Sequence, residues 1–182
     1  MSYSIPVFLI PISYEEIPSK LENWHSAHNI LNQYADISDE NKLWRITSRN
    51  WWLEWHLIRM CEFLEINELE FVGMEIACLG NAELLNGRAA IGKLFDAISD
   101  GMPDFPPDFY PDENLLDYQD IPRQKFREAL RESKPAFDFY AYDSSESYEG
   151  LVDFFSFVKS VQDAIDYSLE RKKFLLIVQP QP

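Results

Sequence analysis

Apolar residues gather in three stretches whose pattern predicts β-strands. Residues 2–12 are rich in β-branched and aromatic types, and Pro6 predicts that this strand lies at an edge or carries a bulge. Residues 137–143 alternate between aromatic and other side chains, and 174–178 form an unbroken apolar run. Because such a run is usually covered on both faces, the last strand is expected inside a small sheet, beside the first.

A period of about 3.6 residues in the apolar positions predicts five helices. They are a segment after Ser13 with Leu21, Trp24, His28 and Leu31 on one face, and segments over roughly 44–66, 81–98, 120–133 and 144–169. The 44–66 segment is apolar around much of its circumference, which predicts the central helix of the core. Asn81 is expected to cap the third helix. Residues 70–79 are interpreted as a strand or as an extension of the 44–66 helix.

These elements predict an α+β fold in which about five helices pack on a small sheet that includes the N- and C-terminal strands. Residues 103–122 interrupt the pattern, since five prolines exclude a regular helix or a central strand. The stretch is also rich in aromatic residues, which disordered linkers usually lack. We therefore expect one globular domain, 1–182, with an ordered acidic loop at 103–122 that is long enough to be functional.

The balance of charge narrows the classes of partner. The 182 residues include 31 Asp and Glu against 16 Lys and Arg, a formal net charge of −15. Such a chain is a poor binder of nucleic acid and of anionic membranes. No basic n-region precedes the apolar N-terminal stretch, and no run of about 18 apolar residues is present. These features predict a cytoplasmic protein without direct nucleic-acid binding or a membrane span.

Motifs for catalysis are missing from the sequence. There is no Gly-rich phosphate loop and no nucleophile elbow. His56 and Cys61 lie five residues apart, on different faces of a helix, so they would not pair. Cys61 and Cys78 are interpreted as reduced, buried thiols, with a single disulfide as the alternative. We expect no cofactor and assign no catalytic residue, and a non-enzymatic role is favoured over an enzymatic one.

One spacing resembles half of a metal site. Glu22, His25 and His28 follow one another at intervals of three residues, which places neighbouring side chains within reach of one metal ion. The second Glu-x-x-His of a di-metal site is missing from the sequence. Because His28 falls on the apolar face of its helix, a hydrogen-bonded, partly buried histidine is the favoured interpretation.

Basic and aromatic residues alternate between 42 and 59, where four of the five tryptophans lie. If these side chains are exposed, they form a pocket for a small anionic ligand or a hot spot for a partner. If they are buried, the tryptophans belong to the core, which is the favoured interpretation. The candidate ligand-binding residues are Arg45, Arg49, Trp52, Trp55 and Arg59.

Acidic residues form runs without an opposing base, and the longest precedes Pro122. Such runs are usually solvated faces, but they also speed the association with a basic protein. The candidate partner-binding residues are Asp104, Phe105, Asp108, Phe109, Tyr110, Asp112, Glu113 and Asp117. The preferred hypothesis is a non-enzymatic intracellular binding protein that engages a basic protein, like an immunity protein or an antitoxin. The alternative is a small enzyme or ligand-binding domain that uses the 45–59 pocket, assisted by a metal at His25 and His28.

Three short stretches resemble an uncharacterised bacterial group of small acidic domains. They are the opening Ser2-Tyr3-Ser4, Trp55-His56-Leu57-Ile58 with the following Cys61-Glu62-Phe63-Leu64, and Pro103-Asp104-Phe105-Pro106. The resemblance implies a bacterial, cytoplasmic protein of one domain, and it implies no activity.

Overall fold

The computed structural model describes residues 4–13, 15, 44–49, 52–69, 76–99, 121–141 and 148–179. Within these ranges the chain forms five strands and four helices, so the α+β class is confirmed and the helices number four rather than about five. The strands are β1 (Ser4–Ile12), β2 (Trp44–Arg49), β3 (Ile76–Leu79), β4 (Asp138–Ala141) and β5 (Phe174–Val178). The helices are α3 (Trp52–Phe63), α4 (Asn81–Ile98), α5 (Arg123–Glu132) and α6 (Tyr148–Glu170). The helix expected after Ser13 lies outside the described residues.

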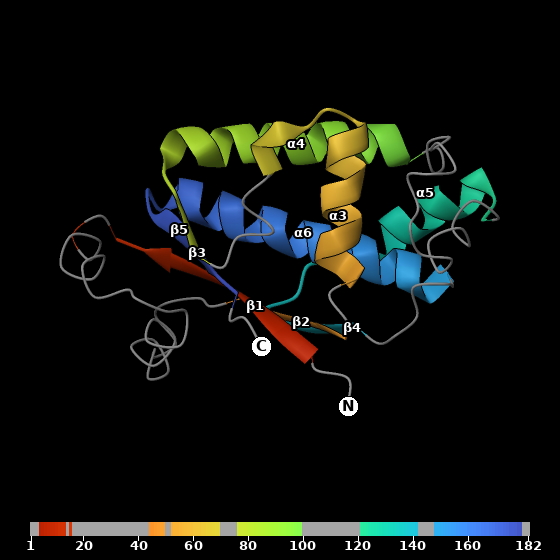
Figure 1. Cartoon of the computed structure of the whole chain (residues 1–182), viewed down its shortest axis with the longest axis horizontal. Helices are drawn as coiled ribbons and strands as arrows, with labels where there is room; N and C mark the ends of the chain where they lie inside the picture. Colours follow the sequence, from red (N-terminus) through yellow and green to blue (C-terminus); the bar gives the residue numbers. More distant parts are fainter. Residues whose placement is uncertain are drawn as a thin grey trace.

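The five strands form one mixed sheet in the order β3-β5-β1-β2-β4 (Figure 1). Strands β2 and β4 pair in parallel, and the other three pairs are antiparallel. The predicted strands at the two ends of the sequence, β1 and β5, are neighbours in the interior of the sheet, as expected. Both faces of these strands are apolar: Val7 and Leu9 belong to the main core, whereas Ile10, Leu176 and Val178 point the other way and are equally buried.

The expectation of an edge strand or a bulge at Pro6 is wrong, because β1 lies between β5 and β2 and its register with β2 is continuous from Ser4 to Leu9. Its two prolines explain how this is possible. Pro6 pairs with β2, whereas pairing with β5 begins only at Phe8. Pro11 pairs with β5, beyond the last β2 pair at Leu9. Each proline therefore stands where β1 has a partner on one side only, and a residue without an N–H is tolerated there.

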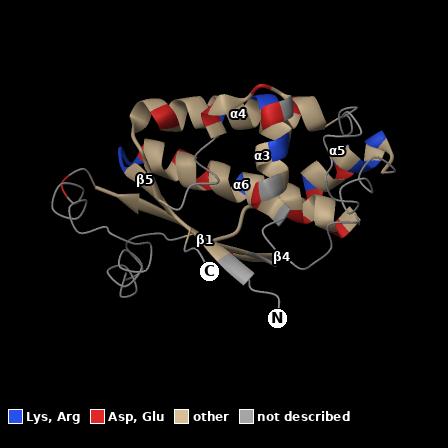
Figure 2. Cartoon of the chain, viewed as in Figure 1, with Lys and Arg blue, Asp and Glu red and all other residues tan. Residues whose placement is uncertain are grey.

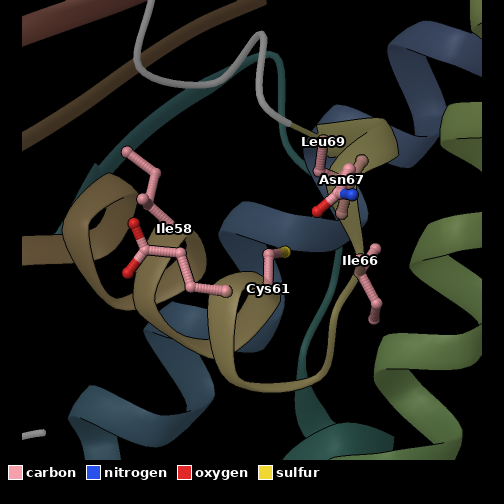
Figure 3. A pocket seen from close by; sticks show the side chains of 6 residues that line it. Ile58, Cys61, Ile66, Asn67 and Leu69 are labelled. Atoms are coloured by element: carbon pink, nitrogen blue, oxygen red, sulfur yellow. The ribbon is translucent and has the colours of Figure 1, made fainter.

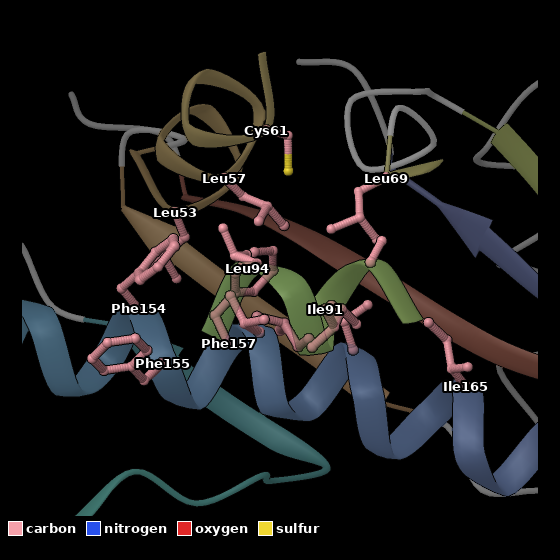
Figure 4. Close-up of a cluster of buried hydrophobic side chains, with 14 of the residues drawn as sticks. Leu53, Leu57, Cys61, Leu69, Ile91, Leu94, Phe154, Phe155, Phe157 and Ile165 are labelled. Carbon is pink, nitrogen blue, oxygen red and sulfur yellow. The ribbon is translucent and has the colours of Figure 1, made fainter. Parts of the chain in front are cut away.

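Helix α6 is the centre of the core. It contacts four strands, and α3, α4 and α5 all pack against it (Figure 1). Its side chains Phe154, Phe155 and Phe157 are fully buried, and they meet Leu57 of α3 and Leu94 of α4 in one cluster (Figure 4). The expectation that a 44–66 helix forms the centre is therefore wrong.

The 44–66 segment is a strand followed by a helix rather than one helix. Trp44 and Ile46 are buried while Arg45 between them is exposed, which is the two-residue period of a strand. Aromatic and β-branched residues such as Trp44, Ile46 and Thr47 pack well on a sheet. The tryptophans at 51, 52 and 55 continue the apolar pattern from the strand into the helix. This continuity is why the sequence pattern predicts a single helix.

The N-terminus of α4 also differs from the expectation. Gly80 is the N-cap residue and Asn81 is the first residue of the helix, so Asn81 is not the cap. A side chain at position 80 would crowd its neighbours, since a Cβ there would lie 3.0 Å from Glu83 Oε2 and 3.2 Å from Phe174 Cε1. The close approach of α4 to β5 therefore favours glycine at this position.

Helices α3 and α6 end in the same motif. Glu65 and Lys172 adopt left-handed backbone angles, with φ of 55° and 54°. In both cases the amide of the next residue donates to the carbonyl five residues earlier, at 2.8 Å. This is a Schellman ending, which usually places glycine at the left-handed position.

Candidate functional site

Two of the predicted sites fall on residues that the structure does not describe. The partner-binding set at 104–117 and the metal set Glu22, His25 and His28 both lie there. Among the residues that are described, no three His, Cys, Asp or Glu side chains come together in a way that could hold a metal ion. Both sets therefore remain predictions.

The described residues carry almost no net charge, so the net negative charge of the chain lies on the other residues. They contain 14 Lys and Arg and 15 Asp and Glu, whereas the remaining residues contain 2 and 16. All 16 of those acids lie in the four sequence ranges 16–43, 70–75, 100–120 and 142–147. On the helices of the described part both signs are interspersed (Figure 2). The excess of negative charge therefore falls on residues outside the described elements.

The predicted ligand pocket is not assembled by those of its side chains that the structure describes. Arg45 is exposed on the face of the sheet opposite the helices, since its neighbours Trp44 and Ile46 face the helical core. Arg59 lies on α3, on the helical side, where its guanidinium is 3.1 Å from the carboxylate of Glu62. The side chains of Arg49, Trp52 and Trp55 are not among those described.

Trp44 belongs to the core, as the favoured interpretation held. It is fully buried, and its indole Nε1 donates to Asp163 Oδ2 of α6 at 3.1 Å. Its ring lies 4.7 Å from that of Phe137 and 5.4 Å from that of Tyr167, centroid to centroid. Arg171 covers Tyr167 in turn, at 4.5 Å from the ring centroid. The indole therefore ties β2 to α6 and is not available to a ligand.

His56 is the described residue type that most often carries proton transfer, but its environment opposes that role. It is 3% exposed and its ring lies 6.3 Å from that of Phe154. Burial lowers the pKa of His56 to about 3, because desolvation penalises the charged imidazolium. The imidazole therefore stays neutral at physiological pH.

The two cysteines are free, as expected, but only one is buried. Cys61 lines a cavity of about 300 Å³ beside α3, together with Ile58, Glu62, Ile66, Asn67 and Leu69 (Figure 3). Burial raises the pKa of Cys61 to about 12, and the nearby Glu68 and Glu62 add to this. Cys78 is exposed on β3, which corrects the expectation of two buried thiols.

Thiol labelling is expected to distinguish the two cysteines. In the folded protein at pH 8, Ellman's reagent should modify Cys78 and leave Cys61 unmodified, since a buried thiol with a raised pKa is protonated and shielded. Cys78→Ser should abolish the reaction, whereas Cys61→Ser should leave it unchanged. Both thiols should react in urea. Modification of two thiols in the folded protein would contradict the burial of Cys61.

A second cavity, of about 490 Å³, lies on α5, and the described residues that line it are Arg123, Gln124, Arg127 and Arg131. The sequence analysis does not predict it, because a charge balance taken over the long acidic region does not resolve the three arginines of this one helix. The signal was present, since arginine recurs at every fourth position of the helix predicted at 120–133.

Neither a membrane-spanning helix nor a similarity to known proteins indicates what the protein does. Within the described residues, no helix is long and apolar enough to cross a membrane. Comparison of the chain with protein-family models, with characterised proteins and with solved structures finds no match. The function must therefore be argued from the chemistry of the chain itself.

Proposed function

We propose that this protein is a non-enzymatic intracellular binding protein that engages a basic protein through an acidic surface, like an immunity protein or an antitoxin. The observation that carries the proposal is the division of charge between a nearly neutral set of packed elements and four segments that hold 16 acids and 2 bases.

The acids of these segments suit recognition of a cationic surface. Segment 100–120 alone contains seven Asp and Glu and no Lys or Arg, together with several aromatic residues. Complementary charge raises the rate of association and disfavours wrong partners, and aromatic residues supply the buried contacts of hot spots. A basic protein is the partner that this composition fits.

The potentially reactive groups in the described elements also favour binding over catalysis. His56 is neutral and buried, and the raised pKa of Cys61 disfavours a thiolate nucleophile. Neither group has the accessible, pH-matched environment that acid–base or nucleophilic catalysis needs.

The test is capture of a partner by two charge variants of the full chain. One variant replaces Asp104, Asp108, Asp112 and Asp117 with Asn. The matched control removes four exposed acids from described elements, through Asp96→Asn, Asp138→Asn, Glu149→Gln and Glu170→Gln. Proteins retained from native extract by the wild type are identified by mass spectrometry, and their affinities are then measured in purified form.

We expect a basic partner whose affinity falls at least about tenfold in the segment variant and changes little in the control. The affinity should also fall between about 0.1 M and about 1 M salt, over which the screening length shrinks from about 10 Å to about 3 Å. Equal losses in the two variants, or a partner whose binding ignores salt, would contradict the proposal.

A further inference from the structure

Helix α5 buries little of its surface. It lies at one end of the helical layer and packs against α6 (Figure 1). Of its ten residues only Phe126 and Ala129 are buried, whereas six are exposed to solvent. Leu130 and the preceding Ile121 are partly buried against the core. In comparison, α4 buries six of 18 residues and α6 buries twelve of 23. Because burial of apolar surface is the main source of stability, α5 is held less strongly than either.

The sequence of α5 adds little stability of its own. Its ten residues are fewer than the about 12–15 that an isolated helix needs in water. The first turn contains Arg123 and Lys125 and no acid, although the positive end of the helix dipole favours acids. The N-cap residue Pro122 makes no side-chain capping bond. The ion pair of Lys125 with Glu128 lies at the surface and contributes little. The helix therefore depends on its docking to α6.

The contacts that join α5 to α6 are largely polar. Lys159 of α6 is partly buried and donates to the carbonyl oxygens of Leu130 and Ser133, the latter at 3.0 Å. It thereby caps the C-terminus of α5. In the first turn of α5, Lys125 Nζ lies 5.2 Å from the centroid of the Tyr148 ring, at the start of α6. One lysine of α6 therefore holds the end of α5 through two hydrogen bonds.

The residues that follow α5 continue along α6 and are held by serine side chains. The amide of Lys134 donates to Ser156 Oγ at 3.3 Å, and the amide of Ala136 donates to Ser160 Oγ at 3.0 Å. Lys134 itself is exposed. Residues 123–136, which we call the α5 strap, therefore form one continuous segment that is docked on α6 mainly by hydrogen bonds.

The α5 strap ends where the sheet begins. The amide of Arg45 donates to the carbonyl of Phe137 at 2.5 Å, and the Phe137 ring lies 4.7 Å from that of Trp44. From Asp138 onwards the chain pairs with β2 as strand β4. These contacts hold Phe137 on β2 and do not involve the strap. If the strap left α6, the change would stop at Phe137 and β4 would stay in the sheet.

We propose that the α5 strap leaves α6 as a unit by local unfolding while the rest of the fold persists, and that Lys159 is the side chain that holds it in place. Proteins open locally in cooperative units, and those with few buried apolar contacts open most readily. Hydrogen bonds to a charged group are stronger than those between neutral groups, and Lys159 makes two of them at the end of α5. Opening uncovers Phe126, Ala129 and the side of α6 that carries Lys159.

Native-state hydrogen exchange of the full chain, read by mass spectrometry, tests the unit. At several urea concentrations below the unfolding transition, peptides from 123–136 are compared with peptides from 151–165, each corrected for its intrinsic exchange rate. We expect the strap amides to exchange at least about tenfold faster than those of α6. Their rates should also depend less on urea, because a local opening exposes less surface than global unfolding. Equal rates with equal urea dependence would show that the two segments open only together, which would overturn the proposal.

The Lys159→Met variant tests the role of the lysine, since it keeps an unbranched side chain without the ammonium group. Exchange of the strap amides should rise about tenfold further, whereas amides of β1 and β5 should change less than about twofold. The matched control Lys93→Met removes an exposed lysine of α4 and should leave exchange of the strap unchanged. A rise in Lys159→Met that is equal in the strap, β1 and β5 would show that Lys159 stabilises the whole fold. That result, or an unchanged strap in Lys159→Met, would overturn the proposal.

Discussion

Replacement of Trp44 with Ala is expected to lower the free energy of unfolding by about 3–5 kcal/mol, which is the range for large aromatic side chains removed from a core. Trp44 is fully buried between β2 and α6, where it packs on Phe137 and Tyr167 and donates to Asp163. Because small domains unfold with about 5–15 kcal/mol, this loss would be a large part of the total stability. Urea unfolding followed by circular dichroism measures the effect.

Two further variants make this prediction specific. Trp44→Phe keeps a ring for the aromatic contacts but removes the indole donor from Asp163, and it should cost about 1–3 kcal/mol. Leu85→Ala removes a side chain that is 42% exposed on α4 and should cost less than about 0.5 kcal/mol. If Trp44→Ala were no more destabilising than Leu85→Ala, the assignment of Trp44 to the core would be wrong.

His56 is expected to make the protein sensitive to mild acid. Its pKa is about 3 in the folded state against 6.5 for an unperturbed histidine, so between these values the unfolded state binds more protons. The neutral His56 therefore favours the folded state fully above about pH 6.5, and this contribution to the free energy of unfolding is lost as the pH falls towards 3. Between pH 7.5 and pH 5 the contribution of this one group amounts to about 2 kcal/mol.

The variant His56→Gln isolates this term, because it keeps a polar side chain that does not titrate. Urea unfolding of the wild type and the variant at several pH values should show a shallower loss of stability in the variant below pH 6.5. The carboxylates are the same in both proteins, so their titration cancels in the comparison. Parallel pH dependences for the two proteins would show that His56 binds a proton as readily in the folded state as in the unfolded state, which would contradict the lowered pKa.

The sequence pattern predicts some elements of this fold well and misplaces others for identifiable reasons. The run Phe174–Val178 and the long helix α6 are predicted closely, because each pattern fits only one type of element. The 44–66 segment is misread, since its aromatic residues fit a helical and a strand period equally well. Pro6 predicts an edge strand incorrectly. A strand in the interior of a sheet can still have residues that pair with a neighbour on one side only, and Pro6 is such a residue.

Whether the residues of a candidate site lie together depends on their distances in the folded protein, and these distances do not follow from their separation in the sequence. Arg45 and Arg59 are close in the sequence, but a strand and a helix carry them to opposite sides of the sheet. The burial of Trp44 follows from its contacts with residues more than 90 positions away. In contrast, the arginines of α5 come together through local helical spacing, and a reading confined to that helix predicts their row.

The position of α6 and β5 in the chain sets the order in which the protein can fold during its synthesis. A ribosome releases β1, β2 and α3–α5 before these two, yet α6 contacts most of the described elements and β5 joins β3 to β1. The earlier elements therefore emerge with their apolar faces uncovered, and such faces promote aggregation. We therefore expect the core to complete its packing only after residues 148–179 have left the ribosome.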